Sequence, residues 1–396
     1  MQLSERITGL TGPEGDGWGL FLRARAMVEA GLPVVELTIG EHDIGTAPAI
    51  LDAMHQAALA GHTGYAAVPG TQALRDAVAA RVAARTGVPT SRDNVLITPG
   101  GQAALFAAHA ATCDAGDRAL FIDPYYATYP GTIRGVGAVP VPVAARPENG
   151  FQPDARDIDA AAAEGGARSL LINTPNNPTG VIYGRETLEA IAETCDRHGL
   201  WLISDEVYDT QIWQGQHLSP RALPGMEART LVVGSMSKSH AMTGSRIGWI
   251  VGPEAAIAHL TNLATHTTYG VPGYIQDAAV FALEQGRALE EEIAAPFARR
   301  RAIAMRLIAG QNVVRMVPSD GAMYVMLEVS ATGLDGAGFA EAALDAERIA
   351  VMPGASFGHA ALDHVRVAMT VEDTMFEDAL TRLLDFAARL ASGAAP

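Results

Sequence analysis

Cysteine is scarce in this chain of 396 residues, and long hydrophobic runs are absent from it. The two cysteines, Cys113 and Cys195, lie far apart in apolar helical patterns, which argues against a disulfide framework and against a metal cluster. No run approaches the roughly eighteen consecutive apolar residues of a membrane span. No signal-peptide pattern follows Met1. We therefore expect a cytoplasmic protein that uses neither a metal site nor a membrane.

Positive charge is also in short supply. The sequence has 28 Lys and Arg residues against 44 Asp and Glu residues, which gives a formal net charge of −16. No basic run offsets the repulsion from phosphates, so this balance disfavours nucleic acid as a partner. The composition favours a small-molecule partner instead.

Short apolar runs alternate with longer segments of helical period between about 93 and 253. This alternation is typical of an α/β domain, in which helices cover a mainly parallel sheet. Between two runs, Leu188, Ile191 and Cys195 recur at helical spacing and Gly199 follows as a C-cap, which predicts a βαβ crossover. The predicted strands are 95–98, 119–122, 169–173, 201–204, 231–234 and 247–251.

The pattern changes near Asp277, where a long charged helix is predicted to begin. Apolar runs around 322–329 and 365–369 and a closing helix over 372–390 follow it, and 34–39 is a further run near the N-terminus. We expect a smaller domain built from both ends of the chain. The expected division is an N-terminal arm and part of the small domain at 1–45, a large ligand-binding domain at 46–280, and a small C-terminal domain at 281–396.

Lys238 lies in the most informative segment, Ser235-Met-Ser-Lys238, which directly follows a predicted strand. Open α/β folds bind ligands at the carboxyl edge of the sheet, and a lysine amine there can condense with an aldehyde cofactor. Ser235 and Arg246 offer a hydroxyl and a fixed cation for a phosphate. The alternative is a solvated surface lysine, but its Ser, Gly and apolar neighbours favour the cofactor.

A second strand ends in Ser204-Asp205-Glu206-Val207-Tyr208. A carboxylate buried at a strand end needs a cationic partner, and a protonated pyridine nitrogen would be one. Pairing with Asp205 would keep such a ring cationic and electron-withdrawing, and Tyr208 can donate to its phenolic oxygen. An N-cap aspartate with an acidic first helical turn is an equally open interpretation.

Three further segments each follow a predicted strand. Asn177, in a turn-rich loop, can present its amide to a cofactor or to a substrate carboxylate, or the loop is simply tight. Gly101, Gln102 and Ala103 begin a helix whose backbone N–H groups can bind a phosphate. Tyr126 offers an aromatic face for stacking on a flat ring, although a loop aromatic more often packs.

Taken together and in this order, these segments resemble the class I/II aminotransferases of fold type I, over about residues 6–390. The resemblance implies an α/β large domain with a mainly parallel, seven-stranded sheet between helices, and a smaller α+β domain from both termini. It also implies pyridoxal 5′-phosphate (PLP) as cofactor. A homodimer with shared active sites is expected.

The resemblance implies roles for individual residues. Lys238 is similar to the lysine that holds PLP as a Schiff base, Asp205 to the pyridinium partner, and Tyr208 and Asn177 to the donors to the phenolic oxygen. Tyr126 resembles the stacking aromatic. The expected contacts at and near the phosphate are Gly101, Gln102, Ala103, Ser235, Ser237 and Arg246.

Other expected roles involve the substrate and the neighbouring subunit. Tyr65 is similar to the tyrosine that reaches the neighbouring subunit's phosphate. Arg366 and Gly40 resemble the groups that hold the substrate α-carboxylate. Without the resemblance, Arg366 would be interpreted as an outward charge on an edge strand.

The implied reaction moves the amino group of an L-amino acid to a 2-oxo acid in a ping-pong cycle, with Lys238 transferring the proton. An aspartate-specific branch has lysine where this chain has Gln102, and His42 stands where many relatives have proline. Segments 17–18, 147–151, 219–226, 237–244 and 269–277 are similar to the branch that includes arginine–pyruvate transaminase. We therefore hypothesise a neutral or basic donor with pyruvate or 2-oxoglutarate as acceptor.

Three alternative functions remain open from sequence. They are an aspartate/2-oxoglutarate aminotransferase, a PLP-dependent C–S β-lyase and, remotely, a non-catalytic PLP-sensing regulator. The regulator would require an appended basic DNA-binding domain, and this acidic chain begins its family-like pattern near Arg6.

Overall fold

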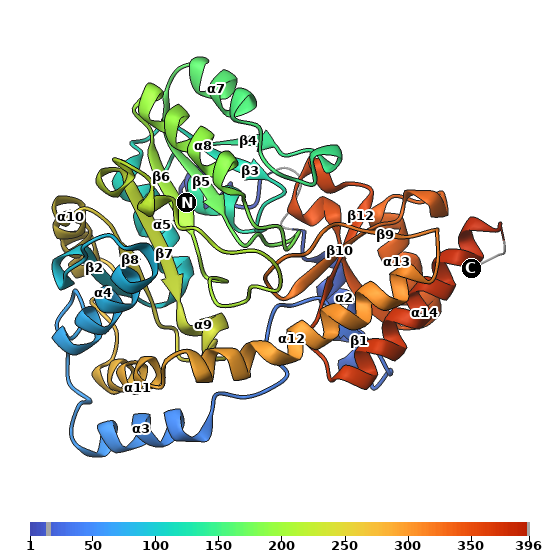
Figure 1. Cartoon of the computed structure of the whole chain (residues 1–396), viewed down its shortest axis with the longest axis horizontal. Helices are drawn as coiled ribbons and strands as arrows, with labels where there is room; N and C mark the ends of the chain where they lie inside the picture. Colours follow the sequence, from blue (N-terminus) through green and yellow to red (C-terminus); the bar gives the residue numbers. More distant parts are fainter. Residues whose placement is uncertain (13–16, 394–396) are drawn as a thin grey trace.

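Two β-sheets organise the computed structural model, which describes residues 1–12 and 17–393 (Figure 1). The larger sheet has seven strands in the order β2-β8-β7-β6-β5-β3-β4. Neighbouring strands are parallel except around β8, which is antiparallel to both β2 and β7. The strands are β2 (Val95–Thr98), β3 (Arg118–Asp123), β4 (Val139–Ala144), β5 (Ala167–Asn173), β6 (Trp201–Asp205), β7 (Thr230–Ser235) and β8 (Gly248–Val251).

All six strands predicted in this region are present, with small shifts at their ends. The seventh strand, β4, was not predicted because its sequence Val139-Pro-Val-Pro-Val alternates with proline, which has no N–H to donate. Such a sequence is tolerated here because β4 lies at the edge of the sheet and pairs only with β3.

Helices cover both faces of this sheet. Because successive strand residues point to opposite faces, Leu202 packs in a core with α8, whereas Ile203 packs in a core with α5. On the α5 side lie α5 (Gly100–Thr112), α6 (Tyr129–Gly135) and α10 (Glu254–Thr265). On the other side lie α4 (Gln72–Thr86), α7 (Ala155–Ala163), α8 (Arg185–His198) and α11 (Gly273–Glu284), with α3 (Pro48–Leu59) packed against α11.

The smaller sheet joins the two ends of the chain. Its strands are β1 (Val35–Leu37), β9 (Arg315–Met316), β10 (Tyr324–Glu328), β11 (Ile349–Pro353) and β12 (His364–Ala368), in the order β1-β11-β12-β10-β9. Strand β1 pairs in parallel with β11, and the other pairs are antiparallel. Around this sheet pack α2 (Gly19–Glu29), α12 (Gly286–Ala309), α13 (Gly336–Glu347) and α14 (Asp373–Ala391). The short helices α1 (Glu5–Thr8) and α9 (Met236–Ser239) complete the α-helices of the described residues.

The long charged helix predicted from near Asp277 is in fact two helices. Asp277 lies inside α11, which ends at Glu284, and the long helix is α12. Gly286, the first residue of α12, has a positive φ of 67°, a conformation that interrupts regular helical geometry and that glycine adopts readily. Helix α12 then runs from the side of the larger sheet to the smaller sheet (Figure 1).

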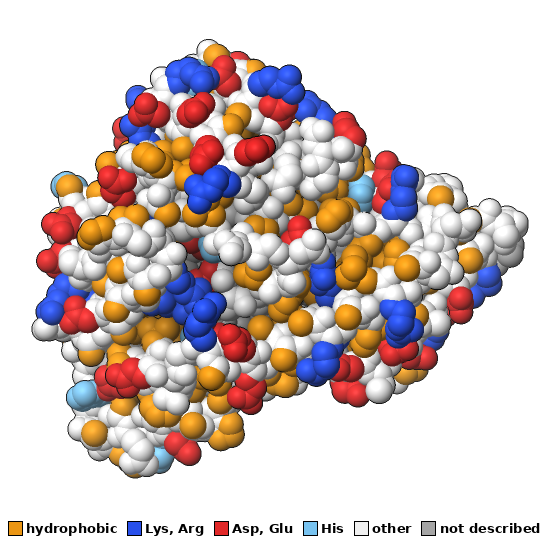
Figure 2. All heavy atoms as spheres, in the orientation of Figure 1, with side chains coloured by type: hydrophobic (Ala, Val, Ile, Leu, Met, Phe, Trp, Pro, Cys, Tyr) orange, Lys and Arg blue, Asp and Glu red, His pale blue; other side chains and the backbone are white. Residues whose placement is uncertain are grey.

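Acidic and basic side chains lie interspersed over the face drawn in Figure 2. Among the residues that the structure describes, no helix is both long enough and apolar enough to cross a membrane.

Candidate active site

A cavity of about 190 Å³ opens at the carboxyl ends of β5, β6 and β7. Because these strands are parallel, their last residues Asn173, Asp205 and Ser235 meet at one edge of the larger sheet, and all three line the cavity. Tyr324 and Arg366, from the smaller sheet, line it as well. Of the residues predicted for the site, all but Ala103 and Tyr65 line this cavity.

Lys238 is the only lysine in the chain. It lies on α9, immediately after β7, and its Nζ donates a hydrogen bond to the carbonyl oxygen of Gly40. Burial lowers its pKa, with Arg366 acting in the same direction. A neutral amine is a nucleophile and a base, so this lysine is suited to covalent chemistry and to proton transfer. The alternative of a solvated surface lysine is wrong.

Asp205 ends β6 with 4% of its surface exposed. Its Oδ2 accepts a hydrogen bond of 2.6 Å from Tyr129 Oη. Burial raises its pKa from 3.8 to about 6, opposed by the Tyr129 hydrogen bond, and no cation of the described residues offsets this cost. Residues 206–209 include no helix, so the N-cap interpretation is wrong. Asp205 is therefore a buried carboxylate that faces a cavity without a cationic partner.

Arg366 lies on β12, an interior strand, and is 2% exposed, so the interpretation as an outward edge charge is wrong. Its guanidinium lies between the rings of Tyr324 and Phe357, each centroid 4.3 Å from Cζ. It donates to Asn177 Oδ1 at 2.8 Å and to the carbonyl of Thr38. Burial lowers its pKa, and no described carboxylate pairs with it. A bound carboxylate would supply the missing anion.

The start of α5 also lines the cavity, through Gly101 and Gln102. Gly100 has a φ of 80°, and a Cβ there would collide with the Arg246 guanidinium. A Cβ on Gly248 would lie 2.9 Å from the carbonyl carbon of Gly100, so the two glycines bring the backbones together. Arg246 donates to the Thr243 carbonyl at 2.8 Å, and Ser235 Oγ lies 2.9 Å from Ser237 Oγ. The free N–H groups of the helix start, these hydroxyls and Arg246 make a site for an anion.

Of three further residues predicted for the site, one lines the cavity and two do not. Tyr126 lines the cavity and its ring meets Tyr129 edge-on at 5.8 Å. Ala103 lies on α5 outside the cavity lining. Tyr65 is 93% exposed and stacks edge-on with Tyr269 at 5.3 Å, so within one chain it is not part of the cavity.

Two tyrosines of the site were not predicted. Tyr129 holds Asp205, and Tyr324 Oη lies 3.1 Å from Tyr208 Oη, while Asn177 Nδ2 donates to the same Tyr208 oxygen at 3.5 Å. No local pattern marks either tyrosine, because one lies in a helix and the other in a distant strand. By contrast, the sequence alone shows that Lys238 is the one lysine that could bind PLP or another aldehyde.

The sequence is similar to a known protein family and to individual enzymes of that family. The family model described as aminotransferase class I and II matches residues 33–383. Arginine–pyruvate transaminase of Pseudomonas aeruginosa is 40% identical over 352 residues, which cover 89% of each chain. Aspartate/prephenate aminotransferase of Thermus thermophilus is 34% identical over 335 residues, 84% of this chain and 86% of that one.

Solved structures extend the comparison to the fold. Aspartate aminotransferase from Thermus thermophilus with maleate superposes with a TM-score of 0.89 at 32% identity, covering 97% of this chain and 100% of that one. The family model spans most of the chain, and both relatives are more than 30% identical over most of their length. This chain therefore belongs to the class I and II aminotransferases and is a PLP-dependent transaminase of fold type I.

Proposed function

We propose that the enzyme takes a neutral or basic L-amino acid as donor and pyruvate or 2-oxoglutarate as acceptor, with Lys238 as the residue that binds PLP. The observation that carries the assignment of roles is the convergence of Lys238, Asp205 and Arg366 on one cavity. The 40% identity to an arginine–pyruvate transaminase supports the choice of donor.

The cavity suits PLP at three points. The start of α5 and Arg246 fit a phosphate, and the Lys238 amine fits an aldehyde. Asp205 is the buried carboxylate whose missing cation a protonated pyridine nitrogen would supply. Tyr208 and Asn177 would then donate to the phenolic oxygen, and Tyr126 would stack on the ring.

We assign the substrate α-carboxylate to Arg366. Its guanidinium is held rigidly between two aromatic rings and has no described acidic partner, so a substrate carboxylate can form a bidentate pair. Asn177 accepts from the same guanidinium and orients it. The Gly40 carbonyl accepts from Lys238, and a side chain at Gly40 would collide with Tyr324. We therefore assign the Gly40 backbone to the substrate carboxylate as well.

Lys238 also carries the proton transfer in this proposal. Bound PLP supplies the electron sink that stabilises negative charge on the substrate α-carbon. The Lys238 amine, whose pKa is lowered by burial, takes the proton from that carbon. Side chains from both sheets surround the cavity, which favours shielding this step from water.

Gln102 bears on donor choice. Its Nε2 donates to Thr132 Oγ1 at 2.7 Å, and its Oε1 accepts from Thr128 Oγ1 at 2.9 Å. Both ends of the amide are engaged, and the side chain has no charge to offer a distal substrate carboxylate. This supports a donor other than aspartate.

The proposal extends to assembly, location and domains. Leu51 and Leu59 on α3 and Tyr65 beyond it are exposed apolar side chains, and their exposure supports a homodimer that covers them. We infer that Tyr65 completes the neighbouring subunit's phosphate site and that the enzyme is cytoplasmic.

We also propose the domain division at 1–45, 46–280 and 281–396. The pairing of β1, near the N-terminus, with β11, near the C-terminus, supports a small domain built from both ends of the chain.

A donor panel tests the proposed substrates. The PLP-loaded enzyme is mixed with arginine, alanine, phenylalanine or aspartate while the visible absorption of the cofactor is followed. We expect arginine or a neutral donor to bleach the band and a 2-oxo acid to restore it. Aspartate faster by orders of magnitude would contradict the donor proposal, and pyruvate with ammonia released without an acceptor would indicate the lyase.

A further inference from the structure

The side chains of residues 205–209 divide into two groups. Asp205, Val207 and Tyr208 line the cavity, whereas Glu206 and Asp209 do not. The side chains of Glu206 and Asp209 are nevertheless only 9% and 18% exposed. Carboxylates so deeply buried are costly unless they are paired, so their partners are part of how this segment is held.

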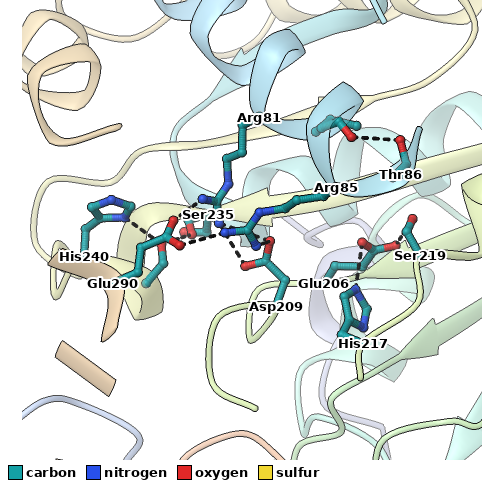
Figure 3. Close-up of polar contacts among 12 residues, drawn as sticks. Arg81, Arg85, Thr86, Glu206, Asp209, His217, Ser219, Ser235, His240 and Glu290 are labelled. Carbon is teal, nitrogen blue, oxygen red and sulfur yellow. Dashed lines mark hydrogen bonds and ion pairs between the residues drawn. The ribbon is translucent and has the colours of Figure 1, made fainter. Parts of the chain in front are cut away.

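Asp209 is clamped by two arginines of α4 (Figure 3). Arg81 Nη2 lies 3.2 and 3.1 Å from its two carboxylate oxygens, and Arg85 Nη1 lies 2.6 Å from Oδ2. Both arginines also bind Glu290 of α12, Arg85 at 2.7 Å. The cluster thus pairs two cations with two anions and ties the segment after β6 to two helices.

Glu206 provides a second anchor on the same segment. Its carboxylate accepts from Ser219 Oγ at 2.7 Å and meets His217 Nε2 at 3.1 Å (Figure 3). The backbone between the anchors is a tight turn, in which Asp209 N donates to the Glu206 carbonyl at 3.0 Å.

The Tyr208 ring is buried and meets the Tyr324 ring edge-on, with centroids 6.0 Å apart. Among the described residues, the Tyr208 hydroxyl meets Tyr324 Oη at 3.1 Å and accepts a long hydrogen bond of 3.5 Å from Asn177. Its carbonyl accepts from Gln211 N at 2.9 Å, and Gln211 Nε2 in turn donates to the Lys238 carbonyl at 3.4 Å. Packing restrains the ring, while the Tyr208 backbone, from which the ring extends, is coupled through this turn to the adjacent Asp209.

We propose that Asp209, clamped by Arg81 and Arg85, is a positioning residue that holds Tyr208 toward the cofactor's phenolic oxygen. Charge-assisted hydrogen bonds are short and directional, so the clamp fixes the turn more firmly than a neutral side chain would. The inference rests on the role proposed above for Tyr208. It adds a set of residues that act on the site without touching cofactor or substrate.

A double-mutant cycle tests this inference without turnover. The readout is the pH midpoint at which the visible absorption of the Lys238-linked cofactor changes. A donor to the phenolic oxygen withdraws electron density and lowers the proton affinity of the neighbouring linkage nitrogen, so Tyr208→Phe is expected to raise the midpoint by roughly one unit. Asp209→Asn is expected to raise it by a fraction of that amount, and not at all when Tyr208 is already Phe.

Two further variants make the cycle decisive. Asp93→Asn is the matched control, because Asp93 pairs at 3.2 Å with Arg75, which lies on α4 like Arg81 and Arg85, but Asp93 is 67% exposed. This control should leave the midpoint unchanged. Arg85→Gln is the milder clamp variant, because Arg85 is 32% exposed and Arg81 remains, and it should shift the midpoint in the same direction as Asp209→Asn.

The outcomes separate the inference from the proposed function. A midpoint unmoved by both clamp variants, or a shift of equal size with and without the Tyr208 hydroxyl, overturns the positioning role. No shift from Tyr208→Phe itself overturns the role of Tyr208 and the inference with it. Failure of every donor to bleach the wild-type band contradicts the proposed substrates alone, because the pH midpoint requires no donor.

Discussion

Replacing Asp205 by asparagine should stabilise the enzyme freed of PLP while weakening its hold on the cofactor. Burial raises the Asp205 pKa from 3.8 to about 6, so the folded chain keeps the proton more tightly than the unfolded chain does. The protonated Asp205 carboxyl therefore contributes fully to the free energy of unfolding below pH 3.8, and this contribution is lost as pH rises through 6. The difference between the two pKa values corresponds to about 3 kcal/mol at pH 8 and to about 1 kcal/mol at pH 4.5.

Asparagine has no charge to desolvate, and its amide oxygen can still accept from Tyr129. Urea unfolding of the PLP-free proteins should therefore show Asp205→Asn more stable than wild type by up to about 3 kcal/mol at pH 8. At pH 4.5 the gain should be about a third of that value. PLP should bind roughly a hundredfold more weakly, because a charge-assisted hydrogen bond is lost. Equal stability at pH 8, or a gain independent of pH, would refute the argument.

Three other substitutions give separate expectations. Arg366→Lys should weaken donor binding roughly tenfold to a hundredfold in a stopped-flow half-reaction while PLP affinity stays unchanged, because lysine lacks the planar fork, and an unchanged donor affinity would contradict the carboxylate assignment. Burial lowers the pKa of His217, but the hydrogen bond and charge of Glu206 raise it more, so the folded protein has the higher pKa. The stability that this pair contributes is therefore full below pH 6.5 and is lost as pH rises through the pKa of the folded protein. His217→Gln should lower the melting temperature more at pH 6 than at pH 9, and an equal loss at both pH values would count against the ion pair. Gly100→Ala should reduce PLP affinity at least tenfold in a fluorescence titration, because the positive φ and the contact with Arg246 exclude a side chain, and unaltered affinity would remove this turn from the proposed phosphate site.

Much of the larger sheet could be predicted because its strands are short, apolar and separated by helical segments. The runs at 169–173 and 201–204 correspond to β5 and β6, and Gly199 ends α8 with the positive φ expected of a C-cap. Strand β4 was not predicted because its prolines interrupt the usual strand pattern. Helices α11 and α12 were predicted as one helix because a single glycine is a weak signal for a helix boundary.

The site could be predicted where residues directly follow strands. Asp205 and Lys238 are such residues, since parallel strands bring their carboxyl ends together. Tyr129 and Tyr324 could not be predicted, because only the packing of α6 and of the smaller sheet brings them to the cavity. The clamp on Asp209 joins α4, α12 and the turn after β6, and no local pattern indicates that contact.

The central claim is that Lys238 binds PLP, and the presence of one lysine in the chain makes the test direct. The PLP-loaded protein is reduced with borohydride and its intact mass is measured, followed by peptide mapping. We expect one reduced PLP per chain, located on Lys238, and none on the Lys238→Arg variant. A donor that bleaches the band in the panel, added before reduction, should remove the adduct, and a 2-oxo acid should restore it. An unmodified Lys238, or an adduct at the N-terminal amine alone, would contradict the account.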